Sequence, residues 1–190
     1  MHIIWNNKQY IGYIIIASRY FGKYLKKKLR KGIEFMRTLI IYCSDYKNNT
    51  QKVASKFNGE IDCDLINVKD AIDINLENYD LIGFGSGVYM ENLSPKLFKL
   101  IERLNLTGKN VFVFSTSGIG MKFYNNKLIK ALTSKGAINK GSFACKGSFI
   151  AKEFSNGKVF DIMGKLAEGH PNDKDFKKAE VFIRKIIDIF

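Results

Sequence analysis

A short polar loop near the start of the chain combines residue types that can bind a phosphate group. The apolar run Thr38–Cys43 is followed by the small polar stretch Ser44–Thr50, and then by Val53, Ala54 and Phe57 at helical spacing. When a strand is followed by a polar loop and then by the start of a helix, the loop directs several backbone N–H groups at one point. The positive end of the helix dipole faces the same point. The loop suits a phosphate, and it equally suits an ordinary strand-to-helix turn with a Ser or Asn cap.

Two further loops, rich in glycine and hydroxyl side chains, follow apolar runs later in the chain. Gly85–Tyr89 follows the run Tyr79–Gly85, and Thr116–Gly120 follows the run Lys109–Ser115. Both runs are apolar enough for strands that are buried on both faces. We therefore expect three small-residue loops, each at the carboxyl end of a strand.

The rest of the chain supplies the elements that position these loops. Strands are expected over 38–43, 61–68, 79–85, 109–115 and 141–146. One helix follows the first loop and a second starts at Pro95, capped by Ser94, with Leu97, Leu100, Ile101 and Leu104 as its buried face. A third spans about 124–135 and stops at Gly136. The glycine-punctuated segment 147–169 has no clear assignment. The last helix follows Asp173, with a predicted buried face of Phe176, Ala179, Ile183, Ile186, Ile187 and Phe190.

Strands that alternate with helices imply an α/β fold with right-handed crossovers. The connections predict a doubly wound, five-stranded parallel sheet in the order 2-1-3-4-5, with helices on both faces. In such sheets a ligand binds outside the carboxyl ends of the strands, at the switch point between strands 1 and 3. The three loops are expected at this edge.

The loops and their order resemble the flavodoxin-like FMN-binding family. The resemblance rests on the first loop (Ser44, Asn49, Thr50, Val53 and Ala54), the runs 79–89 and 111–118, and Gly169–Asp173 before the last helix. Asn48 stands where the family usually has Gly, and Asn tolerates left-handed backbone better than most residues.

The resemblance implies FMN as the cofactor. Its phosphate would be bound by the hydroxyls of Ser44 and Thr50 and by N–H groups of Tyr46, Lys47, Asn48, Asn49 and Thr50. Its ring would lie between the other two loops, bordered by Ser86, Gly87, Val88 and Tyr89 on one side and by Ser115, Thr116, Ser117, Gly118 and Ile119 on the other. Gly87 and Gly118 would let the backbone approach the ring.

Charge divides the chain into two parts. The chain of 190 residues has a net charge of +13, and residues 1–35 contribute +7 of it, while 36–190 contribute +6. We interpret 36–190 as the flavodoxin-like domain and 1–35 as a basic, apolar extension. The extension has three interpretations: sequence ahead of the natural start at Met36, a packed helix, or a helix for peripheral membrane contact.

Three cysteines are too few for a disulfide framework, so a reducing, cytoplasmic compartment is expected. No metal site is expected, because the two histidines are far apart and no zinc spacing occurs.

The function expected from these features is electron transfer through FMN, either as a carrier or as a small oxidoreductase. The partner would be an acidic redox protein or a small-molecule acceptor, and nucleic-acid binding is not expected. A phosphatase using Cys43 is a weaker alternative, because Asn49 stands where an Arg would clamp the phosphate. A flavin-less interaction domain of the same fold is the other alternative.

Overall fold

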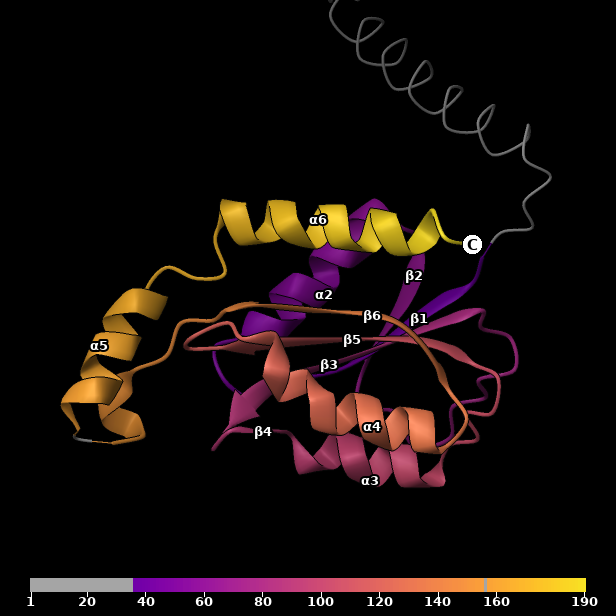
Figure 1. Cartoon of the computed structure of the whole chain (residues 1–190), viewed down its shortest axis with the longest axis horizontal. Helices are drawn as coiled ribbons and strands as arrows, with labels where there is room; N and C mark the ends of the chain where they lie inside the picture. Colours follow the sequence, from indigo (N-terminus) through magenta and orange to yellow (C-terminus); the bar gives the residue numbers. More distant parts are fainter. Residues whose placement is uncertain (1–35, 156) are drawn as a thin grey trace, which may run out of the picture. The chain divides into compact units, whose positions relative to one another are not determined.

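Five parallel strands form the central sheet of the computed structural model, which describes residues 36–155 and 157–190 (Figure 1). The strands are β1 (Thr38–Cys43), β2 (Cys63–Asn67), β3 (Leu81–Tyr89), β5 (Asn110–Ser117) and β6 (Ile138–Lys146). Their order is β2-β1-β3-β5-β6, which confirms the predicted doubly wound topology. The predictions made for residues 1–35 lie outside the described residues.

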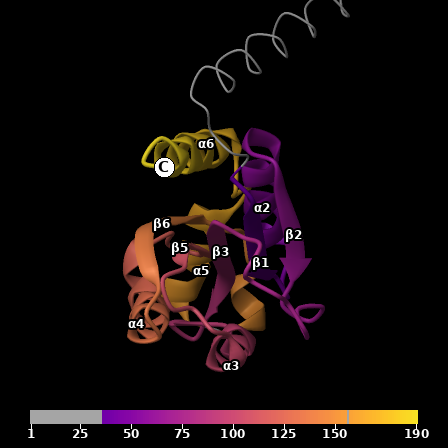
Figure 2. The same cartoon turned by 90° about the vertical axis from the view of Figure 1, so that its right-hand side faces the viewer.

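Helices cover both faces of the sheet (Figures 1 and 2). One face is covered by α2 (Asn49–Glu60) and α6 (Asp173–Ile187), and the other by α3 (Pro95–Arg103) and α4 (Asn126–Ser134). The start of α3 follows its sequence signals, because Ser94 Oγ accepts a hydrogen bond from Lys96 N–H at 3.3 Å and Pro95 occupies the first turn. The buried face predicted for α3 is confirmed.

Two side-chain clusters fill the space between the layers. On the α3 and α4 side, Leu39 and Ile41 of β1 belong to the same buried cluster as Leu97 and Leu128. On the α2 and α6 side, four phenylalanines pack ring against ring around the fully buried Phe57: Phe112, Phe114, Phe143 and Phe182. Each buried aromatic side chain stabilises the fold by roughly 1.5–3 kcal/mol.

The strand β3 is longer than predicted, and its glycines have a different role. The residues expected to form a loop, Gly85–Tyr89, continue the strand, and a two-residue strand β4 (Asn92–Leu93) pairs with its end in antiparallel fashion. A Cβ at Gly83 would lie 2.4 Å from the Phe112 ring, and one at Gly85 would lie 2.0 Å from the Phe114 ring. Gly83 and Gly85 therefore make room for aromatic rings from the neighbouring strand β5.

Several other boundaries differ from the prediction, and β2 spans only Cys63–Asn67 instead of 61–68. β5 extends to Ser117, β6 begins at Ile138, and a 3₁₀ turn, η1 (Lys122–Asn125), precedes α4. The unassigned segment contains a second 3₁₀ turn, η2 (Ala151–Glu153), and a helix, α5 (Lys158–Ala167). In α6 the predicted burial of Phe190 is wrong, because the helix ends at Ile187 and the Phe190 side chain is 49% exposed.

Candidate functional site

The carboxyl ends of β1, β3 and β5 meet at one edge of the sheet. The parallel register pairs Cys43 with Ser86, and Gly87 with Thr116. The loops that follow line one cavity of about 360 Å³, which is within the range of about 300–1,000 Å³ for small-molecule sites. The three stretches predicted as loops therefore line one cavity, although Gly87–Tyr89 and Thr116–Ser117 belong to the ends of β3 and β5.

The loop between β1 and α2 has the backbone geometry of an anion site. Lys47 and Asn48 both adopt left-handed conformations, with φ of 49° and 53°. In the described part of the chain, the N–H groups of residues 46–50 donate no hydrogen bond of normal geometry. Five consecutive donors at the N-terminus of α2 are thus available to an acceptor.

The two hydroxyl side chains of this loop that were predicted to bind the phosphate form hydrogen bonds within the protein. Ser44 Oγ accepts a hydrogen bond from Gln51 N–H at 3.2 Å, which leaves its own proton free to donate. Thr50 Oγ1 lies 2.9 Å from Thr116 Oγ1, and both residues are buried. The Thr50–Thr116 bond joins the β1 loop to the end of β5.

Asn49 links the same loop to the segment that follows β6. Its Nδ2 donates to the carbonyl oxygen of Ser148 at 2.8 Å. Its Oδ1 is buried and has no partner among the described residues. Since a buried polar atom without a partner costs about 1–3 kcal/mol, a hydrogen-bond donor from a ligand would relieve this cost.

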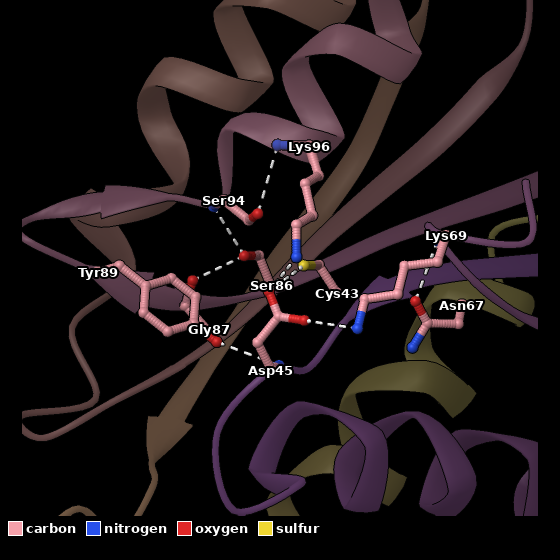
Figure 3. Close-up of polar contacts among 9 residues, drawn as sticks. All are labelled: Cys43, Asp45, Asn67, Lys69, Ser86, Gly87, Tyr89, Ser94 and Lys96. Carbon is pink, nitrogen blue, oxygen red and sulfur yellow. Dashed lines mark hydrogen bonds and ion pairs between the residues drawn. The ribbon is translucent and has the colours of Figure 1, made fainter.

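A charged cluster holds Asp45, the second residue of the loop (Figure 3). Asp45 Oδ2 lies 2.8 Å from Lys96 Nζ, and Asp45 Oδ1 lies 3.3 Å from Lys69 Nζ. The hydrogen bond from Lys96 is the main reason that the pKa of the Asp45 carboxyl lies below its ordinary value. Because all three side chains are partly exposed, each ion pair stabilises the fold by only about 0–1 kcal/mol.

Tyr89, at the end of β3, is attached to this cluster. Its hydroxyl accepts a hydrogen bond from Asp45 N–H at 3.2 Å, and burial raises the pKa of the phenol. The side chain folds back over Gly87, where a Cβ would lie 2.9 Å from the Tyr89 hydroxyl. Gly87 is thus required for close packing at the cavity wall.

Ser86 lies behind the cavity wall and forms hydrogen bonds with backbone groups of two nearby residues. It is fully buried, donates to the Gly87 carbonyl at 2.6 Å, and accepts from Ser94 N–H at 2.9 Å. The bond to the Gly87 carbonyl orients the peptide between Gly87 and Val88.

The segment after β6, here called the arm (residues 147–155 and 157–168), forms the remaining wall. It contributes Phe149, Phe154, Val159, Phe160 and Met163 to the cavity. The Phe149 ring lies against Gly118, where a Cβ would be 2.5 Å from Cε1. The arm makes this side of the cavity apolar and aromatic.

Cys43 has the environment of a structural cysteine. It is fully buried at the end of β1, and this burial is the main reason that its pKa is raised. Reactive cysteines are accessible and have lowered pKa values. The geometry therefore offers no support for the phosphatase alternative.

Comparison with known proteins agrees with this geometry. Residues 39–154, more than half of the chain, match the family described as flavodoxin domain. The chain belongs to the flavodoxin domain family.

Relatives and solved structures extend the comparison over most of this flavodoxin domain. The chain is 36% identical over 154 residues to the uncharacterized protein MJ0298 of Methanocaldococcus jannaschii, covering 80% of this chain and 99% of that one. It is similar in structure to a flavodoxin from the domain Archaea, with a TM-score of 0.56, 15% identity, and coverage of 80% of this chain and 97% of that one. A flavodoxin from Streptococcus pneumonia TIGR4 gives a TM-score of 0.55 and 16% identity, with 81% and 99% covered. At these identities the structures establish the shared fold.

The flavodoxin domain places most of the predicted cofactor-binding residues together. Those that line the cavity are Tyr46, Asn49, Thr50, Gly87, Val88, Tyr89, Thr116, Ser117, Gly118 and Ile119. The others lie beside or beneath it: Ser44, Lys47 and Asn48 in the first loop, and the fully buried Ser86 and Ser115 under the wall.

Sequence reasoning missed the charged cluster and the arm. Asp45 follows Ser44 directly, but nothing local indicated that Lys69 and Lys96 would reach it. For the arm a signal existed, since Phe160, Met163 and Ala167 recur at helical spacing. No helix within residues 36–155 and 157–190 is both long and apolar enough for a bilayer span.

Proposed function

We propose that this flavodoxin domain binds FMN in the cavity and transfers electrons through it, as a carrier or as a small oxidoreductase. The observation that carries the proposal is the convergence of three loops, distant in sequence, on one cavity at the switch point of the sheet. Membership of the flavodoxin domain family supports it.

The first loop fits the phosphate of FMN. Its five free N–H groups and the unused proton of Ser44 are donors available to the phosphate oxygens. Each hydrogen bond to a charged group contributes roughly 1.5–3 kcal/mol, so a few of them account for a large share of a tight complex. The left-handed conformation of Asn48 fits the family loop, which usually has Gly at this position.

The other two loops fit the ring. Gly87 and Gly118 carry no side chain that would hold a planar ring away from the backbone. When bound, FMN supplies one- and two-electron chemistry at this ring. The chain's own contribution is to bind the ring edge with backbone groups near Gly87, whose carbonyl the Ser86 hydroxyl holds in place.

A specific observation keeps the flavin-less alternative in view. The Tyr89 hydroxyl and the Phe149 ring lie against the two glycines that would face the ring. A flavin-less interaction domain would keep these contacts permanently, whereas FMN binding requires the two side chains to move aside.

Titration of the purified full chain with FMN tests the proposal. We expect quenching of FMN fluorescence with a dissociation constant in the micromolar range or below, and release of the flavin on denaturation. Riboflavin, which lacks the phosphate, is the matched control and should bind at least tenfold more weakly. A colourless protein that binds no added FMN would refute the proposal and favour the interaction domain.

A further inference from the structure

An open groove of about 520 Å³ lies along α2 and shares no lining residue with the cavity. Its volume is within the range of about 300–1,000 Å³ for small-molecule sites. We propose that this groove binds an adenosine phosphate group attached to the flavin phosphate, so that the chain binds the flavin dinucleotide FAD more tightly than FMN. The proposal rests on the proposed function in assigning the flavin ring to the cavity and its phosphate to the first loop.

The position of the groove next to the phosphate loop carries the argument. From the first loop and the start of α2, the cavity is lined by Tyr46, Asn49 and Thr50. The groove is lined by residues interleaved with these: Asn48, Gln51 and Lys52. The free N–H groups of residues 46–50 belong to the backbone that connects the two sets. A phosphate bound to these N–H groups lies beside both spaces, so a group attached to it can enter the groove while the ring occupies the cavity.

The side chains of the groove have the chemistry of a nucleotide site. Along α2 they recur at helical spacing on one side and carry amide, hydroxyl and ammonium groups: Asn48, Gln51, Lys52, Ser55 and Lys56. The remaining lining residue is Phe176, near the start of α6, whose side chain is partly exposed. An aromatic ring offers a stacking surface to the face of a base, and amide groups can donate to and accept from its edge. The lining therefore suits a base together with a phosphate.

Lysine supplies the charge that a second phosphate requires. Among the described residues that line the groove, the charged ones are Lys52 and Lys56. Lys56 Nζ lies 2.7 Å from Glu180 Oε1, and this ion pair joins α2 to α6. Lys52, one turn closer to the first loop, forms no ion pair with any residue that the structure describes. Its ammonium group is therefore available to the second phosphate of a dinucleotide.

Calorimetric titration of the full chain with FMN and with FAD tests the proposal. FAD is FMN with adenosine monophosphate attached to its phosphate, so the ratio of the two dissociation constants measures what the groove contributes. We expect the wild-type chain to bind FAD at least fivefold more tightly than FMN.

Two variants of the groove and two matched controls complete the experiment. Lys52→Ala removes the free ammonium group, and Phe176→Leu keeps an apolar side chain but removes the ring for stacking, so each should reduce the preference for FAD at least threefold. The controls Lys99→Ala and Phe98→Leu make the same changes on α3, which covers the opposite face of the sheet, and should leave the preference unchanged. Ala and Leu both favour helices, and circular dichroism checks that all four variants remain folded.

Two results would overturn this proposal and leave the proposed function intact. The first is a chain that binds FMN and binds FAD no more tightly. The second is a preference for FAD that the groove variants and the control variants change equally, which would place the adenosine phosphate elsewhere. If the chain binds FAD but no FMN, and only the groove variants weaken FAD binding, this proposal stands and FMN fails as the cofactor. A chain that binds neither flavin refutes both proposals.

Discussion

Replacing Gly85 by Ala tests whether β3 carries glycines for packing or for a turn. The added Cβ would lie 2.0 Å from Phe114 Cζ and 2.4 Å from both Cε atoms, closer than Cβ contacts in folded proteins allow. The ring has little room to move, because Phe114 is fully buried and Phe57 packs edge-on against it at 5.1 Å. Overpacking of this kind costs about 1–3 kcal/mol.

The matched control is Gly59→Ala, in the helix α2. A Cβ at Gly59 has nothing within 4 Å, and Ala is a better helix former than Gly by about 0.5–1 kcal/mol. We therefore expect the two Gly→Ala changes to have opposite signs, with Gly85→Ala destabilising and Gly59→Ala stabilising. In a protein of this size each kcal/mol changes Tm by about 2–4 °C.

Urea unfolding followed by circular dichroism measures both variants. Adding Phe114→Leu to Gly85→Ala should recover part of the loss, so that the double variant is at least about 1 kcal/mol more stable than additivity predicts. Wild-type stability in Gly85→Ala, or strict additivity in the double variant, would refute the packing argument. Gly85 would then be an ordinary turn or strand glycine.

Three further predictions concern the first loop. Asn48→Gly should retain the FMN affinity, whereas Asn48→Val should lower it at least tenfold, because a β-branched residue resists a φ of 53°. Equal dissociation constants for the two variants would contradict the role of the left-handed conformation. Thr50→Val should weaken FMN binding about tenfold or more, because it removes a hydrogen-bond donor to a charged group, while the control Thr133→Val on α4 should leave binding unchanged. Undiminished FMN affinity in Thr50→Val would show that the Thr50 hydroxyl does not bind the phosphate. Asp45→Asn should cost about 0.5–1 kcal/mol at pH 7. The pKa of Asp45 is lower in the folded state, so the carboxylate stabilises the fold above its ordinary pKa of 3.8, and this stabilisation is lost as the pH falls through the lowered pKa. The difference in unfolding free energy between wild type and Asp45→Asn, measured by urea titration, should therefore be smaller at pH 3 than at pH 7. An equal difference at both pH values would contradict the ion-pair assignment.

Sequence reasoning succeeded where the signal is local. The apolar run of β1, the cap and buried face of α3, and a left-handed Asn48 all follow from residues close together in the chain. It placed Gly83 in a strand correctly but predicted a loop from Gly85 and gave neither glycine a packing role, because the reason for these glycines is a pair of aromatic rings about 29 residues away on β5. The sequence alone does not distinguish a glycine that makes room for an aromatic ring on a neighbouring strand from a glycine that forms a turn.

The candidate site shows the same division. Loop membership was predictable because glycine and hydroxyl residues follow each apolar run. The interactions between loops were not, since the partners of Asp45, Tyr46 and Asn49 lie between 24 and 107 residues away. The arm escaped assignment because glycines punctuate the segment, although Lys158, Asp161 and Lys165 do form a polar face on α5.

The β1–α2 loop connects the other parts of the site, because four of its residues contact the end of β3, the arm and the end of β5. Asp45 holds Tyr89 at the end of β3, Tyr46 and Asn49 hold the arm, and Thr50 holds Thr116 at the end of β5. An acceptor bound to the free N–H groups of this loop would therefore act on all three neighbours at once. A ligand that binds the loop through a phosphate would therefore also order the other walls of the cavity. A ligand without a phosphate would not bind these N–H groups and would not have this effect.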